Sequence, residues 1–383
     1  MKRICLVGLL ALEAACGGDH QRATTRVDSA GVEIVTYAGP DVPLTWSFDS
    51  LFALGGADSG PQSFYQVHGA VGGDVAGNIY VLDTSAKRIV MFDSTGAFVR
   101  SMGRAGGGPG EMKWPIALVV APDGRSAVFD IGKGGLVWFG SAGEGLNLDP
   151  LGTLYNGGSL HVTAHALYLP SHTWNSGSSD PGRQELVRIA DGDTVRLISV
   201  PNAPGKAVTF KSCGMSISGM TPIFSPSLRW AASGDRVAVT AMTGYEILLL
   251  SGTDTTEIVR RPLEPEPATA EAAAKQVGDK FRVMSSAGEI VCKTDEVVDG
   301  VGFADHIPVV AGIAAGPDST WWVRRAASAG VDVYAADGEY LGTLPDSAPY
   351  PLLSLPGQRI AAAVTDDLDV ERLVIYRVRM NGS

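Results

Sequence analysis

The sequence has little positive charge and, after its first residues, no apolar run long enough to cross a membrane. Lysine and arginine number 30 against 41 aspartate and glutamate residues, which gives a net charge of −11 at pH 7. An acidic surface repels phosphate backbones, so we expect no nucleic-acid partner. The apolar stretch 4–12 is too short to span a bilayer, so any membrane attachment needs another means.

Several motifs of well-known enzymes are also missing. The sequence has no Cys-x-x-Cys pair and no Gly-x-Ser-x-Gly elbow; the nearest approach, 214–219, has serine where the second glycine should fall. The glycine-rich segment 103–112 does not match a phosphate-binding loop, because Pro109 interrupts it and no Lys-Ser or Lys-Thr follows. We expect a sharp turn there.

The sequence does have short apolar strands in regular order between glycine turns. The segments 77–83 and 124–130 align without a gap at an offset of 47 residues, and they end in Asp83 and Asp130. Each unit reads as a glycine turn, an apolar strand, a polar turn and a second apolar strand that ends in an aromatic residue. Repeats of this length are typical of propeller blades.

Further matches at 235–239 and 319–323 extend the repeat, and the last unit, which begins near Leu352, lacks a fourth strand. Propellers close when the N-terminus supplies the missing strand, and 32–37 and 46–54 are available for this. We therefore predict an all-β fold. It is a six-bladed β-propeller with four-stranded blades, formed by a single domain over 31–383, whose last blade is closed by an N-terminal strand.

One region breaks the blade pattern. Residues 262–308, between blades four and five, contain a helix candidate at 269–275 with Thr269 as its N-cap. This partly helical insertion can cover one mouth of the central channel or pack on the rim, and we expect the rim. Cys292 lies in it, 79 residues after Cys213. A disulfide between them and two buried thiols are both open alternatives.

The N-terminus is typical of an export signal, because Lys2 and Arg3 precede the apolar stretch and small residues precede Cys16. Residues 1–16 resemble a bacterial lipoprotein signal, although Glu13 stands where that pattern has an apolar residue. The resemblance implies lipidation of Cys16, with ordinary cleavage or no lipidation as alternatives. It also implies a location outside the cytoplasm, on an outer membrane and facing the periplasm. The polar residues 17–30 are expected to form a flexible tether.

The order of motifs along the chain resembles NHL- and TolB-like propeller repeats. More specifically, it is similar to a family of bacterial six-bladed β-propeller proteins, many of them lipoproteins. The segments that carry this resemblance are 28–36, the Gly-Pro-Gly-Glu turn at 108–111, 321–323 with 331–334, and 374–378. Arg325 departs from the pattern, because the first two blades have aspartate at this position. The resemblance implies the fold and an extracytoplasmic location, and it supplies no reaction.

Six-bladed propellers bind ligands on the axis, where the first strands of several blades meet. His68, His161 and His306 lie near the first strands of alternate blades and form the candidate channel-mouth site. Three imidazoles can hold a zinc ion with an open position. The alternative, which we favour, is that each histidine is hydrogen-bonded separately near a turn. Calcium binding or acid–base work by Asp83 and Asp130 is disfavoured, because repeated aspartates usually bond the backbone of the next turn.

From these observations we predict a binding scaffold at the cell envelope for a protein or a small-molecule ligand. We expect a monomer without a resident cofactor, attached to the membrane by a lipid anchor only, and we favour a protein that is not an enzyme. The alternative is a metal-dependent NHL-type lyase or lactonase-like hydrolase that uses zinc or calcium at an axial site. The two differ in whether metal-ligating side chains converge on the axis.

Overall fold

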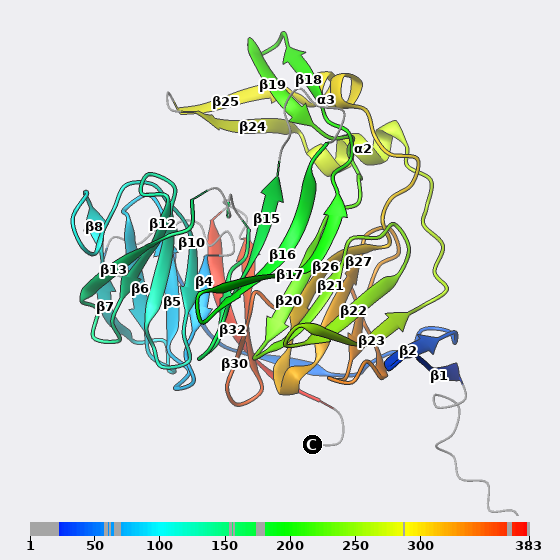
Figure 1. Ribbon diagram of the computed structural model, residues 1–383, viewed down its shortest axis with the longest axis horizontal. Helices are drawn as coiled ribbons and strands as arrows, with labels where there is room; N and C mark the ends of the chain where they lie inside the picture. Colours follow the sequence, from blue (N-terminus) through cyan, green and yellow to red (C-terminus); the bar gives the residue numbers. More distant parts are fainter. Residues whose placement is uncertain are drawn as a thin grey trace, which may run out of the picture.

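The computed structural model describes residues 23–56, 60, 63–64, 70–152, 155, 158–173, 181–285, 288–365 and 370–380. These residues form the six predicted blades beside the central channel, and the four strands that follow one another in each blade pair antiparallel (Figure 1). Blade one consists of β4 (Val71–Gly73), β5 (Ile79–Asp83), β6 (Arg88–Phe92) and β7 (Phe98–Met102). Blade two consists of β10 (Pro115–Val120), β11 (Ser126–Asp130), β12 (Gly135–Phe139) and β13 (Gly145–Pro150). Blade three consists of β14 (His161–Val162), β15 (Leu167–Thr173), β16 (Arg183–Ala190) and β17 (Asp193–Pro201).

Blades four and five follow in the same order, and blade six takes its outermost strand from the N-terminus. Blade four contains β20 (Arg229–Ser233), β21 (Arg236–Thr240), β22 (Glu246–Ser251) and β23 (Asp254–Arg260). Blade five consists of β26 (Val310–Ala315), β27 (Trp321–Arg325), β28 (Val331–Tyr334) and β29 (Tyr340–Leu344). Blade six consists of β30 (Leu353–Leu355), β31 (Arg359–Thr365), β32 (Glu371–Arg379) and β3 (Ser47–Leu54).

The predicted closure of the ring is confirmed in β3. This strand pairs antiparallel with β32, so that Phe48 lies opposite Val378 and Leu54 opposite Leu373. Without β3 the edge of β32 would present a row of unpaired backbone groups to solvent. The N-terminal strand therefore completes blade six and joins the two ends of the chain in one sheet.

The other N-terminal candidate, β2 (Val32–Tyr37), extends blade four instead of blade six. It pairs parallel with β23, and β1 (Thr24–Ser29) then pairs antiparallel with β2, so blade four has six strands. Residues 24–29 are thus a strand, not the tether expected from their polarity. An outermost strand that exposes five of its six residues needs no apolar pattern.

Side chains that alternate along each strand pack against the two neighbouring blades. In β5, Tyr80 and Leu82 join the cluster shared with blade two, whereas Ile79 and Val81 join the cluster shared with blade six. Successive residues of a strand point to opposite faces of the sheet, and both faces are covered here. This is why the repeat reads as an unbroken apolar run followed by Asp83.

Two insertions that flank blade four pack together into a subdomain that we call the cap. It consists of β18 (Lys206–Phe210) and β19 (Met215–Met220) from one insertion, and α2 (Ala270–Val277), β24 (Lys280–Ser285), β25 (Gly288–Lys293) and α3 (Thr294–Val301) from the other. Figure 1 shows them gathered at one end of the blades. The predicted N-cap is confirmed, since Thr269 Oγ1 accepts a hydrogen bond from the Ala272 amide at 3.1 Å.

A disulfide joins the two halves of the cap. Cys213, in the turn between β18 and β19, is bonded to Cys292 in β25, with their Cα atoms 5.0 Å apart. Around this bond lie Phe210, Val297 and Val301, all buried. The hairpin β18–β19 was not expected from the sequence. The disulfide fixes this hairpin to the insertion at 262–308, which was expected.

No helix in the described ranges is long and apolar enough to cross a membrane. Residues 1–22, with the export signal and Cys16, lie outside the described part of the chain. The signal at 1–16 and the lipidation of Cys16 therefore stay predictions.

Candidate functional site

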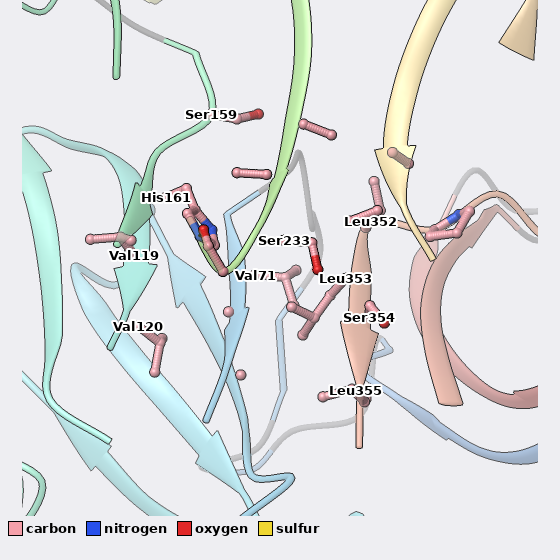
Figure 2. A pocket seen from close by; sticks show the side chains of 18 of the residues that line it. Val71, Val119, Val120, Ser159, His161, Ser233, Leu352, Leu353, Ser354 and Leu355 are labelled. Atoms are coloured by element: carbon pink, nitrogen blue, oxygen red, sulfur yellow. The ribbon is translucent and has the colours of Figure 1, made fainter. Parts of the chain in front are cut away.

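The first strands of all six blades surround a cavity of about 640 Å³, the channel cavity, shown in Figure 2. Its wall also includes the turns between the first and second strands, among them Asp74, Pro122 and Asp318. Because the strands of a blade alternate in direction, these turns all lie on one face of the propeller. The connections between blades, which include both cap insertions, leave from the other face. The channel cavity therefore opens opposite the cap.

Aliphatic side chains are the most frequent kind in the wall of the channel cavity. Figure 2 shows Val71 and Leu353 pointing toward one another near its centre, with the hydroxyl of Ser233 beside them. Val120 and Leu355 contribute further apolar surface from blades two and six. Such a lining favours an apolar group, whose transfer from water contributes about 25 cal/mol for each Å² buried.

The carboxylates of the channel cavity are already engaged. Asp74 accepts hydrogen bonds from the side-chain amide of Asn78 at 2.7 Å and from the Tyr80 hydroxyl at 3.1 Å, besides two backbone amides. Asp318 accepts one from Gln358 at 3.1 Å. Both oxygens of Asp74 thus have donors and Oδ2 of Asp318 has one, so the two carboxylates shape the turns around the cavity.

The structure does not bring His161 and His306 together. His161 lines the channel cavity, where its Nε2 donates to the Gly234 carbonyl oxygen at 2.9 Å. Burial lowers the pKa of His161, which keeps its imidazole uncharged at neutral pH. His306 is exposed in the connection to the cap and pairs with Pro267, and His68 lies outside the described residues. The described ranges contain no group of three His, Cys, Asp or Glu side chains placed to hold a metal ion.

A second cavity of about 950 Å³, the cap cleft, lies between the cap and blades four and five. Lys275 and Gln276 of α2 line it on one side, and Arg229, Val310 and Arg324 at the ends of blade strands line it on the other. We expected the helix to pack on the rim. This expectation is wrong in that α2 faces residues of β20 and β26, which are first strands and therefore surround the channel. The hairpin β18–β19 and the disulfide hold the cap in this place.

The cap cleft is locally positive in an acidic chain. Four of its charged side chains are cationic and two, both exposed, are acidic. The chain as a whole carries a net charge of −11. The cations are Arg229, Lys275, Arg324 and Arg325, and the acids are Glu266 and Asp346.

One of these cations, Arg325, is neutralised within the protein. Its guanidinium contacts Asp332 at 2.7 Å and Asp41 at 2.8 Å, and Arg261 contacts the same two carboxylates at 3.0 and 2.8 Å. We call these four residues the arginine–aspartate cluster. The side chain of Asp332 has no exposed surface, so its charge depends on both arginines. The cluster joins blades four and five to the N-terminal segment.

The two repeated aspartates have structural partners. Asp83 accepts a hydrogen bond from the Ala86 amide, and Asp130 accepts from the amides of Lys133 and Trp114. The expected bonding to the backbone of the following turn is confirmed for both residues. Neither is left with oxygens that point to a ligand site.

Sequence reasoning missed Arg229 and Arg324. A single arginine at the end of a strand is common on any exposed rim, so composition offers no warning. The repeat does carry one signal: at the offset of 242 residues, Arg324 falls on Leu82 of blade one, which is 1% exposed. A cation in place of a core residue indicates a local change of environment.

The comparisons with known proteins agree with this fold. No curated protein matches the chain. The model of the family DUF5128, described as a 6-bladed beta-propeller, matches residues 73–116, in blades one and two. Among solved structures, a protein of Bacteroides fragilis NCTC 9343 described as exported has 14% identity and a TM-score of 0.51, over 91% of this chain and 99% of that one.

Two further structures are less similar. A member of the duf4221 family from Bacteroides vulgatus has 10% identity and a TM-score of 0.44, over 88% of this chain and 99% of that one. A gluconolactonase from Xanthomonas campestris has 14% identity and a TM-score of 0.39, over 93% and 99%. The fold, the family model and the Bacteroides fragilis structure together define this chain as a six-bladed β-propeller protein.

Proposed function

We propose that this protein is an extracytoplasmic binding protein whose channel cavity takes the apolar part of a small molecule. The observation that supports this most directly is a cavity of about 640 Å³ in whose described wall aliphatic side chains are the most frequent kind and no lysine or arginine is present. An anionic group would lose its hydration there without a cation to pair with, whereas an apolar group gains from burial.

Three observations support the extracytoplasmic part of the proposal. The N-terminal pattern is that of an export signal ending at Cys16, the disulfide of the cap is of a kind that persists in oxidising compartments, and a structurally similar protein is described as exported. In this proposal a lipid on Cys16 holds the protein at the cell envelope. Mass spectrometry of the mature N-terminus tests it: a lipid-modified Cys16 is expected, and an unmodified chain that keeps residues 1–15 would contradict it.

Binding in the channel cavity is tested with the uncharged dye N-phenyl-1-naphthylamine, which fluoresces in apolar surroundings. We expect saturable binding to the wild type. In Ser233→Trp an indole fills the centre of the cavity, and we expect the affinity to fall about tenfold or more, since about 1.4 kcal/mol of lost contact is a factor of ten. The matched control is Ser251→Trp, an exposed serine of the same blade, which should bind as the wild type does.

Equal binding by all three proteins would place the dye elsewhere and contradict the proposal. So would the lack of saturable binding by the wild type. Circular dichroism of each variant shows whether the propeller is intact before its affinity is interpreted.

A further inference from the structure

Residues of the same two strands line both the cap cleft and the channel cavity. In β20, Arg229 lines the cap cleft and the next residue, Trp230, lines the channel cavity. In β26, Ala311 lines the first and Ile313 the second. Neighbouring residues of a strand are about 3.3 Å apart along its axis, so the two spaces are within reach of one small molecule.

Arg324 and Tyr350 connect the two spaces. The guanidinium of Arg324 lies 4.0 Å from the centre of the Tyr350 ring, and Tyr350 lines the channel cavity while Arg324 lines the cap cleft. The Tyr350 hydroxyl donates to the Trp322 carbonyl oxygen at 3.2 Å, which fixes the ring against β27. The cation is thus held at the boundary between an apolar channel and a positive cleft.

The side chain of Arg324 has unused hydrogen-bonding capacity. Its Nε is buried and has no partner among the described residues, although a buried donor without an acceptor is unfavourable. Arg229, close enough to influence the same tyrosine, likewise has no ion pair within the described ranges. Arg325, in contrast, is fully occupied by the arginine–aspartate cluster. Two guanidinium groups in one cleft are therefore left to meet an acceptor from outside the chain.

We propose that the cap cleft binds the acidic group of the ligand whose apolar part occupies the channel cavity. The ligand class is an anionic amphiphile with a carboxylate or phosphate head. This inference rests on the proposed function, since it identifies the other half of the same ligand. Guanidinium groups pair with carboxylates and phosphates through two parallel hydrogen bonds, and they attract anions where the rest of the surface is acidic.

The test compares two probes that differ only in their head group: 11-(dansylamino)undecanoic acid and its methyl ester. The wild type should bind the acid about tenfold or more tightly than the ester, because one good charged pair contributes roughly this factor. Arg324→Gln and Arg229→Gln should each weaken binding of the acid toward that of the ester and leave binding of the ester unchanged. Arg125→Gln, an exposed arginine of blade two, is the matched control and should change neither affinity.

Competition with dodecanoate and with dodecyl phosphate then shows which head group the cleft prefers. If Arg324→Gln does not fold, Arg229→Gln and Lys275→Gln decide the question, because both side chains are exposed. Equal affinities for acid and ester in every protein would overturn this inference and leave the proposed function intact. If the wild type binds neither probe nor N-phenyl-1-naphthylamine, both fail.

Discussion

The disulfide between Cys213 and Cys292 encloses most of blade four, and its removal gives a prediction with a definite size. The closed segment spans 79 residues and contains four of the six strands of blade four, β20 to β23. A bridge across such a segment restricts the unfolded chain, since it prevents blade four from separating from its flanking insertions. The perturbation is the double variant Cys213→Ala/Cys292→Ala, which removes the bond and leaves no free thiol in the cap.

The chain-entropy relation assigns a loop of this length about 4.5 kcal/mol of stabilisation at 25 °C. Unfolding entropy near the melting temperature is about 2.1 cal/mol/K for each residue, or ~0.7 kcal/mol/K for the roughly 330 residues that the structure describes. Dividing the first figure by the second gives a fall in melting temperature of about 6 °C. Lost packing around Cys292, which is 2% exposed, adds to this value.

The assay is calorimetric unfolding of the oxidised wild type, the wild type kept in reductant, and the double variant. Thiol labelling of the denatured proteins establishes which samples contain the bridge. Oxidised protein should melt last, and the reduced wild type and the variant should melt close together. If the bridge is present and the oxidised and reduced forms melt within about 1 °C, the bond does not restrain the unfolded chain as argued.

Three further predictions concern the joints between blades. Asp332→Ala should cost about 3–5 kcal/mol in urea unfolding, because it leaves two buried arginines without their shared carboxylate; the same change at the exposed Asp123 should cost less than about 1 kcal/mol. Gly96→Ala places a Cβ 2.6 Å from a ring atom of Phe52 in β3, at a residue whose φ is +88°. It should destabilise the protein more than Gly134→Ala, where φ is +67° and no atom lies within 4 Å of the added Cβ. Equal urea midpoints would show that the contact between blades six and one adjusts to the added Cβ without cost. Burial acts to raise the pKa of Asp41, but hydrogen bonds from the two arginines outweigh it and lower this pKa below its usual value. Asp41→Asn should therefore reduce stability above about pH 4, and the difference from the wild type should vanish as the pH falls through the folded-state pKa. Urea midpoints at pH 6 and pH 3 would test this trend.

The strands of the repeat were predictable because their signals are local. β5 and β11 coincide with the two aligned segments, and β21 and β27 with the weaker matches. Each is an apolar run bounded by a turn, and turn residues such as Gly96 and Gly143 have the positive φ that favours glycine. Local chemistry of this kind is complete within about ten residues, so a single sequence is sufficient to find it.

Pairings between distant segments were less accessible. The apolar pattern of Val32–Tyr37 does not indicate that it joins β23 in parallel, because its contacts lie in distant segments: Tyr37, for example, stacks on Tyr340 of blade five with 4.2 Å between ring centres. The hairpin β18–β19 was missed for a related reason. Its buried residues Val208 and Phe210 pack against α3 and β25, which lie many residues later in the chain. The apolar residues within 201–228 therefore have no nearby segment in the sequence against which a hairpin could be predicted to pack.

The candidate site shows a similar division. The axial position of His161 was predicted, since the first strand of every blade must face the channel, and the structure places it there. The spacing in the sequence could not show whether His161 and His306 lie close together. His306 belongs to an insertion, and the path of that insertion depends on how the cap packs. The cap cleft itself depends on two insertions and a disulfide, and no single stretch of sequence describes it.

Arg324 and Arg325 show what a departure from the repeat can mean. Arg324 falls on Leu82 of blade one, Arg325 falls on the aspartate of blades one and two, and the two arginines are neighbours in β27. Arg325 forms ion pairs with Asp332 and Asp41 inside the protein, so this departure has a structural role. Arg324 replaces a core leucine, and no acid of the described chain neutralises it. The presence or absence of an internal partner, and not the departure itself, therefore separates the structural arginine from the one we assign to a ligand.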